Sequence, residues 1–209
     1  MRLRFLLTAA LAALVPLAAF AVDGVILIDQ NKALAGSVTP GDAPGFPVSL
    51  TRPGSYRLSG NLTLPAAGDG IVIASDGVSL DLNGFSIVGV GGATARGVTD
   101  ENLTRSQVSI RNGRITGFPS SLRLQSSNRV VVENLFADPG PVGLAIVVGG
   151  FSRVQRNVSG SNGLIQAECP SILSENITDG FITVFLVDTS KQCVRSHNRS
   201  LNFGNDVTE

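Results

Sequence analysis

Short stretches of alternating hydrophobic and polar residues recur along the chain, and many of them end in an asparagine. Strict alternation over a few residues is typical of a half-buried β-strand. A related earlier stretch, residues 78–84, contains Asn83 and Gly84. The later asparagines follow one another at nearly constant intervals and are Asn112, Asn134, Asn157, Asn176 and Asn198. The pattern therefore indicates an internal repeat of about 22 residues.

A second set of short strands is predicted between these stretches, separated from them by turns rich in glycine, serine, asparagine and aspartate. It comprises residues 70–73, 121–124, 143–148, 163–165 and 181–187. No amphipathic helical pattern follows residue 36. Each repeat thus holds at least two strands. The leucine signature of leucine-rich repeats is missing, and a propeller blade needs about 40 residues, so both architectures are excluded.

Stacking each repeat on the next as rungs about 4.8 Å apart pairs neighbouring backbones and buries the apolar side chains. The pattern therefore predicts an all-β fold, a single-stranded parallel β-helix of roughly seven rungs and about 30 Å over residues 56–204. The recurrent asparagines are predicted to stack at one corner. Asparagine tolerates a left-handed backbone there, and stacked amides hydrogen-bond from rung to rung.

The chain also resembles a known group of proteins. Residues 78–87 (VSLDLNGFSI) resemble a rung of the secreted bacterial right-handed parallel β-helix repeat proteins, which are related in fold to the pectate lyases. Residues 40–47, 53–58 and 61–64 are similar to the lead-in of that group, and the Cys-Pro-Ser at 169–171 is similar to a segment near its end. The resemblance covers residues 23–205 and implies a right-handed solenoid; it implies little about activity.

The N-terminus has the pattern of a secretory signal peptide. Arg2 and Arg4 precede an apolar run over residues 5–17, and Ala19-Phe20-Ala21 is a small-x-small cleavage pattern. We expect removal of residues 1–21, export to the periplasm or the exterior, and no membrane span in the mature chain. Residues 22–55 are predicted to form an N-terminal cap and a Pro-rich connector, with a strand or short helix at 26–34. Residues 56–209 form the β-helix domain with a polar C-terminal tail.

The two cysteines, Cys169 and Cys193, are separated by close to one repeat. A disulfide between neighbouring rungs is predicted in an oxidising compartment, with free thiols as the alternative. Relative to the following asparagines the two cysteines are offset by two residues, so a bulge or shorter turn near Pro170 is required. The single histidine excludes a His-based zinc site, and no metal or cofactor is predicted.

The number and positions of the charged residues bear on the possible functions. Lys+Arg and Asp+Glu both number 16, and charged residues are only 15% of the chain, which argues against a nucleic-acid binder. The residues before the asparagines are predicted to stack as a ladder of alternating charge. They are Arg111, Glu133, Arg156, Glu175 and His197. Such a ladder either aids rung pairing or forms a groove for sugars, with Arg111 and Arg156 binding carboxylates and His197 carrying a proton.

Two function classes follow. The first is a non-catalytic exported scaffold that binds polysaccharide or presents a surface at the cell envelope. The second is a small polysaccharide lyase or epimerase acting on polyuronates, for which clustered aspartates and Ca²⁺, or paired carboxylates, are the established schemes. The chain has no Asp-Asp or Asp-x-Asp pair and only two lysines. We therefore favour the first class, with Arg111, Arg156 and His197 as the catalytic candidates under the second.

Overall fold

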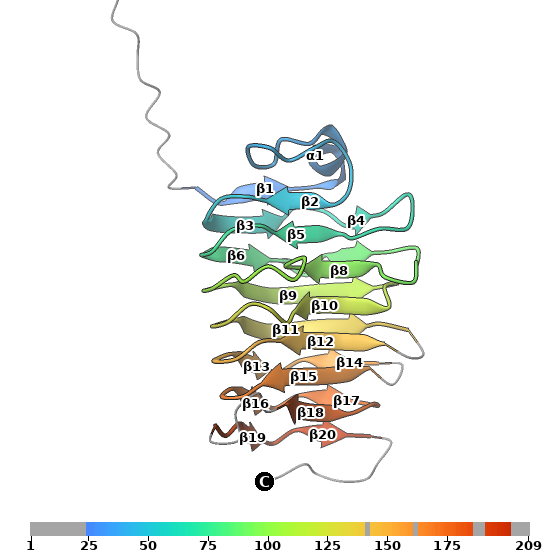
Figure 1. Ribbon diagram of the computed structural model, residues 1–209. Helices are drawn as coiled ribbons and strands as arrows, with labels where there is room; N and C mark the ends of the chain where they lie inside the picture. Colours follow the sequence, from blue (N-terminus) through green and yellow to red (C-terminus); the bar gives the residue numbers. More distant parts are fainter. Residues whose placement is uncertain (1–23, 141–142, 161–162, 186–190, 202–209) are drawn as a thin grey trace, which may run out of the picture.

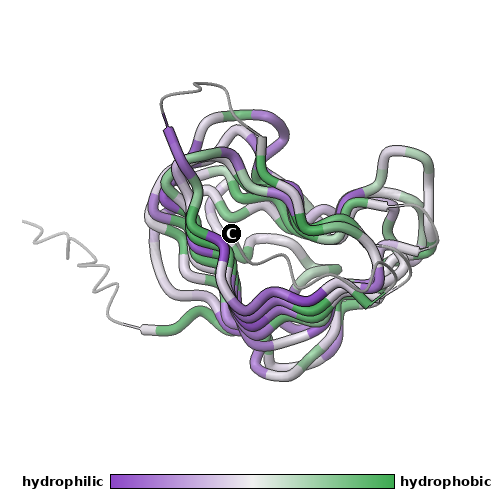
Figure 2. Tube along the Cα trace, turned by 90° about the horizontal axis from the view of Figure 1, so that it is seen from below, coloured by the Kyte–Doolittle hydropathy of each residue, from purple (hydrophilic) through white to green (hydrophobic). Residues whose placement is uncertain are grey.

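The chain forms a parallel β-solenoid of about six turns (Figure 1). The computed structural model describes residues 24–140, 143–160, 163–185 and 191–201. Viewed along the stack, successive rungs superpose (Figure 2). The predicted all-β stack is confirmed, and its expected rung count is close to the observed one. The predicted signal peptide and residues 202–209 of the polar tail lie outside the described residues.

The described strands form a sheet of 13 and a sheet of seven, and they pair in parallel. The larger sheet bends, so that each rung contributes to three faces. The first face carries β1 (Ile26–Ile28), β3 (Gly54–Leu58), β6 (Val78–Asp81), β9 (Ser109–Thr116), β11 (Val131–Asp138), β13 (Arg153–Gln155), β16 (Ile172–Ser174) and β19 (Val194–Ser196).

The second face continues the same sheet beyond the bend, through the C-terminal halves of β9 and β11. Its other strands are β4 (Leu62–Thr63), β7 (Ser86–Val88), β14 (Val158–Ser159), β17 (Ile177–Thr178) and β20 (Arg199–Ser200). The third face is the smaller sheet. Its strands are β2 (Val48–Leu50), β5 (Ile71–Ile73), β8 (Arg96–Thr99), β10 (Ser120–Leu124), β12 (Leu144–Val148), β15 (Leu164–Glu168) and β18 (Ile182–Phe185).

The core consists of columns of apolar side chains, one from each rung. On the first face a single register position stays buried through successive rungs. Its occupants are Tyr56, Leu80, Ile110, Val132, Val154 and Leu173. In β19 the same position is held by Arg195, so the apolar column ends there. Alternation of period two along each strand thus translates directly into one buried and one outward column.

The N-terminal end of the stack is covered by α1 (Gln30–Ala35), which follows β1 (Figure 1). The Asp29 side chain caps this helix by accepting a hydrogen bond from the Lys32 backbone N–H at 2.8 Å. Ala33 is fully buried against the core. The segment expected to be a strand or a short helix is therefore both, and it protects the edge of the first rung from solvent and from other chains.

The predicted disulfide joins Cys169 to Cys193, whose Cα atoms are 5.1 Å apart. Strand β16 pairs with β19 in a register that places Ile172 opposite Val194, and this separation is two positions shorter than that of the cysteines. Cys169 precedes its strand by three positions and Cys193 by one. Pro170 and Ser171 therefore absorb the offset in the turn, which is where the sequence required it.

Candidate functional site

The asparagines lie at the bend between the first and second faces, in two neighbouring columns. At this bend, which we call the asparagine corner, one residue per rung has a left-handed backbone with φ between 52° and 59°. These residues are Asn83, Asn112, Asn134, Arg156, Glu175 and His197. Pairing of Glu133 with Gln155 and of Phe136 with Val158 places Arg156 opposite Asn134.

The expected single column of five asparagines is therefore wrong in its register. Only Asn112 and Asn134 occupy the left-handed position; Asn157, Asn176 and Asn198 occupy the next position, where they are fully buried. The cause is the length of this rung. The pairing of Glu133 with Gln155 shows that the rung is one residue shorter than the interval from Asn134 to Asn157, so Asn157 lies one position beyond the residue opposite Asn134. A shift of one residue turns a side chain from outside to inside.

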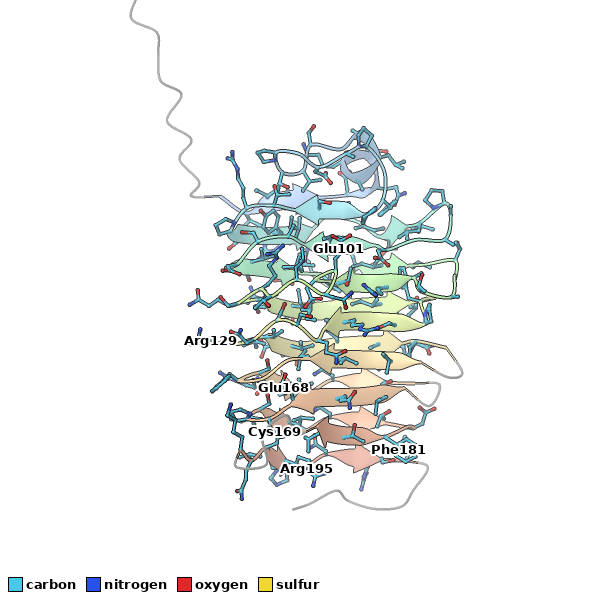
Figure 3. All side chains as sticks on the ribbon, viewed as in Figure 1. Glu101, Arg129, Glu168, Cys169, Phe181 and Arg195 are labelled. Atoms are coloured by element: carbon cyan, nitrogen blue, oxygen red, sulfur yellow. A yellow bond between two sulfur atoms is a disulfide. The ribbon has the colours of Figure 1, made fainter. Side chains whose placement is uncertain are left out.

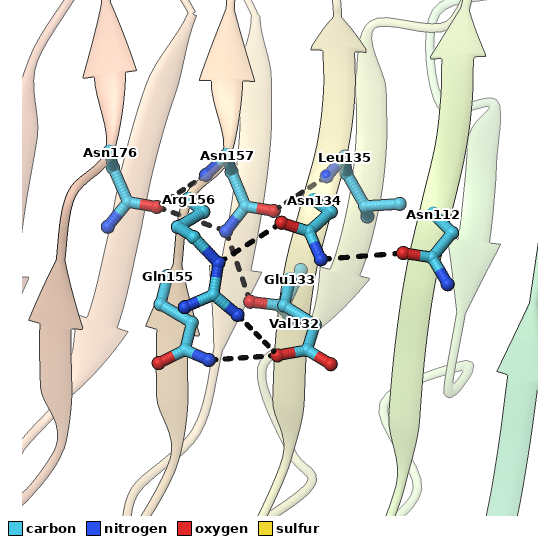
Figure 4. A network of polar contacts seen from close by, with 9 residues as sticks. All are labelled: Asn112, Val132, Glu133, Asn134, Leu135, Gln155, Arg156, Asn157 and Asn176. Carbon is cyan, nitrogen blue, oxygen red and sulfur yellow. Dashed lines mark hydrogen bonds and ion pairs between the residues drawn. The ribbon is translucent and has the colours of Figure 1, made fainter. Parts of the chain in front are cut away.

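The buried asparagines form a continuous hydrogen-bonded ladder, of which Figure 4 shows Asn157 and Asn176. The Asn157 Nδ2 donates to Asn176 Oδ1 at 3.0 Å, and the Asn176 Nδ2 donates to Asn198 Oδ1 at 2.9 Å. Each carboxamide oxygen also accepts the backbone N–H of the preceding rung, beginning with that of Leu135. The outer pair is weaker, with Asn134 Nδ2 at 3.4 Å from Asn112 Oδ1. The ladder therefore serves rung pairing.

The predicted charge ladder is also wrong in register. Arg111 and Glu133 share one column of the first face, whereas Arg156, Glu175 and His197 belong to the left-handed column. The two arginines predicted to bind a sugar carboxylate, Arg111 and Arg156, instead face carboxylates of the chain itself. Arg111 Nε lies 3.4 Å from Asp81 Oδ2, and Arg156 Nη2 lies 3.1 Å from Glu133 Oε2 (Figure 4).

The three catalytic candidates are not brought together into one site. Arg111 and Arg156 are two rungs apart and in different columns, and each bridges to a carboxylate of a neighbouring rung. His197 is exposed at the asparagine corner of the last described rung. The geometry favours the interpretation that the two arginines align rungs, each surface pair contributing at most about 1 kcal/mol.

The Asp81 carboxylate lies within ion-pair distance of both Arg57 and Arg111, and its ionisation makes the stability of the fold depend on pH. Burial acts to raise the pKa, but hydrogen bonds from the Asn83 backbone and the Asn112 side chain, together with the charge of Arg111, outweigh it and lower the pKa below the ordinary value. A lowered pKa stabilises the fold above the unfolded-state value of about 3.9, and this contribution is lost as the pH falls through the folded-state pKa.

We therefore expect Asp81→Asn to reduce the free energy of unfolding by about 1–2 kcal/mol at pH 7. The difference from the unaltered protein should be complete above about pH 5 and should shrink as the pH falls below about 4. Urea unfolding of both proteins from pH 7 to pH 2.5 measures it. A difference that stays constant over this range would show that the ionised carboxylate contributes nothing.

A second line of left-handed residues marks the opposite corner, where the chain passes from the third face to the first. Gln107, Arg129 and Phe151 have φ of 58°, 53° and 56° and follow one another at equal intervals of one rung. A bulky side chain in this backbone conformation is unusual and strained. Phe151 is also 63% exposed, although a phenylalanine is normally buried. Strain and exposure in one aromatic residue point to a functional role.

Phe151 borders a polar hollow of about 320 Å³, which we call the Phe151 pocket. The pocket is lined by the exposed side chains of Gln125, Arg129 and Lys191 and by the half-buried Glu168. The Lys191 ammonium lies 5.8 Å from the centre of the Phe151 ring, within cation–π range. Figure 3 shows Arg129, Glu168 and Cys169 on the same side of the stack, with Phe181 on the other.

Two glycines, Gly149 and Gly150, line the Phe151 pocket. A Cβ atom on Gly149 would overlap the carbonyl oxygen of Ser127, so no other residue fits there without a shift. A Cβ atom on Gly150 would lie 3.9 Å from the carboxyl carbon of Glu168, on the lining of the pocket. Backbone therefore takes the place of side chains beside this carboxylate.

Phe151 also borders an apolar hollow of about 260 Å³. Pro170, Ile172 and Val194 line it, and the latter two are 46% and 58% exposed. The disulfide between Cys169 and Cys193 fixes the adjoining turn. Cys169 also lines the polar pocket, so the bond holds part of its wall in place. The corner thus presents an aromatic ring that lines both a polar and an apolar hollow.

This corner combines hydrogen-bond donors, an acceptor and a ring on one open surface. Such a set can bind a polyhydroxylated ligand. Among the described residues no three His, Cys, Asp or Glu side chains are grouped so as to hold a metal ion. The Phe151 pocket is not predicted from the sequence, although the equal spacing of Gln107, Arg129 and Phe151 is a signal of a second corner.

Fold and site together define a parallel β-solenoid that carries a polar pocket and an exposed aromatic residue at one corner. Comparison with known proteins finds no family model, no curated protein and no solved structure that matches the chain. In the part of the chain that the structure describes, no helix is long and apolar enough to cross a membrane.

Proposed function

We propose that this protein is an exported, non-catalytic β-solenoid scaffold that binds glycans at the Phe151 pocket. The observation that carries the proposal is the exposed Phe151 ring, held in a left-handed backbone beside a polar pocket. A sugar ring has an apolar C–H face and a rim of hydroxyl groups. The Phe151 ring can pack against the apolar face of the sugar. The side chains of Gln125, Arg129 and Glu168 can hydrogen-bond its hydroxyl groups.

The polar groups of the pocket support recognition of neutral as well as charged sugars. The side chains of Arg129 and Lys191 can donate hydrogen bonds to a ligand, that of Glu168 can accept them, and that of Gln125 can do both. The rungs hold these groups in place, because Gly149 donates its N–H to Leu124 and Arg129 donates its N–H to Gly150. A site built on backbone that is already ordered loses little entropy on binding.

Export to an envelope or extracellular space fits this function. The disulfide between Cys169 and Cys193 is of the kind that persists in an oxidising compartment. The signal-peptide pattern of residues 1–21 and the resemblance of residues 78–87 to secreted bacterial β-helix proteins of the pectate-lyase-like group support the same assignment. No cofactor is required.

Binding is tested with Phe151→Ala on a panel of neutral and acidic polysaccharides, followed by calorimetry with the best ligand. We expect the loss of the ring to weaken binding about 10- to 30-fold, which is typical of a central aromatic contact. Phe181→Ala is the matched control, since Phe181 is an exposed phenylalanine on the other side of the stack and should leave affinity unchanged.

Two results would contradict the proposal. Equal glycan affinity of the Phe151→Ala variant and the unaltered protein would show that glycans do not bind at the Phe151 pocket. Formation of unsaturated sugar ends, measured by their absorbance, would show that the protein is a lyase. Phe151→Gly separates binding from folding. It removes the ring and also relieves the left-handed backbone, so it should bind weakly while being about 1 kcal/mol more stable than Phe151→Ala.

A further inference from the structure

A larger cavity lies at the N-terminal end of the solenoid and shares no residue with the Phe151 pocket. Its volume is about 570 Å³, which is within the range of small-molecule sites. Ile26 of β1 and Tyr56 of β3, which are paired in register, line it together with Val38 and the prolines Pro40 and Pro53. The lining is thus predominantly hydrocarbon and aromatic.

The two hydroxyl groups of this lining already have partners within the chain. The Thr39 hydroxyl donates to the Ser49 carbonyl and accepts a hydrogen bond from the Thr51 backbone N–H at 3.1 Å. The Tyr56 hydroxyl donates to the Arg52 carbonyl at 2.7 Å. An apolar group that enters the cavity therefore leaves no buried polar atom unpaired, and it displaces water from apolar surface.

Arg52 is the one charged residue of the lining. Its side chain is exposed, and within the described residues it forms no ion pair, unlike Arg57, Arg111 and Arg156. A guanidinium group binds a carboxylate through two parallel hydrogen bonds, with a matching charge. Charge complementarity thus selects an anionic group at the edge of an apolar cavity.

We propose that this cavity binds small amphiphilic carboxylates, with the hydrocarbon part against Ile26, Pro40 and Pro53 above the buried Tyr56 ring, and the carboxylate on Arg52. This site is independent of glycan binding, because the two cavities have no lining residue in common. Binding here would give the protein a second ligand class beside the glycan.

The cavity contains its own spectroscopic probe. Tyr56 is the only tyrosine of the chain, which has no tryptophan, so tyrosine emission reports this site alone. Burial raises the pKa of Tyr56, so the phenol stays protonated at neutral pH. Titration of the full chain with hexanoate, octanoate and decanoate should change this emission saturably, with affinity rising about fourfold for each added methylene.

Arg52→Gln tests the anion contact, because it removes the charge and keeps the backbone carbonyl that holds the Tyr56 hydroxyl. We expect it to weaken decanoate binding about tenfold and to leave the binding of 1-decanol unchanged. Arg153→Gln, an exposed arginine of β13, is the control and should change neither. Three results would each overturn the proposal: no saturable change in emission, equal affinity of the protein for decanol and decanoate, or an unchanged decanoate affinity in the Arg52→Gln variant.

Discussion

Replacing Asn176 by alanine is expected to lower the free energy of unfolding by about 3 kcal/mol. The Asn176 carboxamide is fully buried and makes four hydrogen bonds. Its oxygen accepts the backbone N–H and the Nδ2 of Asn157, and its Nδ2 donates to the Val154 carbonyl and to Asn198 Oδ1. Truncation leaves the buried Asn157 N–H without its partner, and a buried donor left unpaired costs about 1–3 kcal/mol by itself.

The remaining loss comes from the ladder as a whole, because Asn176 links the amide of Asn157 to that of Asn198. Denaturant unfolding followed by far-ultraviolet circular dichroism measures the effect. Asn134→Gly is the matched control: Asn134 is exposed, and glycine suits its left-handed backbone, so the change should stay within about 0.5 kcal/mol. Equal losses in the two variants would mean that the buried column has no special role.

Removal of the disulfide by Cys169→Ala together with Cys193→Ala is expected to cost about 3 kcal/mol. The bond joins cysteines with a sequence separation of 24, and the chain-entropy model gives this magnitude for a loop of that size. The loss should be concentrated in the C-terminal rungs, because rungs of a solenoid are stabilised chiefly by their nearest neighbours. Hydrogen exchange should therefore accelerate in β16 and β19 before it does in β3 and β6.

The same variant tests the link between the disulfide and the Phe151 pocket, since Cys169 lines that pocket. Glycan affinity should fall in parallel with the protection of β16. A thiol assay on the unfolded, unreduced protein is the control for the starting state. Two titratable thiols in that assay, or unaltered stability of the double variant, would show that the bond does not stabilise the rungs.

The architecture could be predicted from the amino-acid sequence alone. Alternation of period two defines which side chains of a strand face the core, and the recurrence of about 22 residues leaves stacking of parallel rungs as the way to bury them. The span between Cys169 and Cys193 matches one rung plus the two extra positions of a turn, so their pairing was also predictable. These properties depend on local pattern and on distance along the chain.

The register of the asparagine corner, by contrast, is a property of the tertiary structure. Spacing measures the length of a rung, but it does not say which residue of the rung takes the left-handed position. In three rungs the left-handed position is held by Arg156, Glu175 and His197, so the asparagine that follows each of them lies inside. The backbone N–H groups of Asn157 and Asn176 each donate to the carboxamide oxygen of the asparagine in the next rung. That choice depends on hydrogen bonds between rungs, which no single repeat contains.

The two candidate sites were also beyond the reach of sequence pattern, for a related reason. The Phe151 pocket brings together Gln125, Glu168 and Lys191 from three different rungs, and Gly149 on its lining fits against the Ser127 carbonyl only because glycine has no Cβ atom. The N-terminal cavity is lined by Val38, from the loop that follows α1, together with Tyr56 of β3. Periodicity specifies the strands that stack, whereas a surface hollow is made by the turns between them, whose paths are set by contacts with neighbouring rungs.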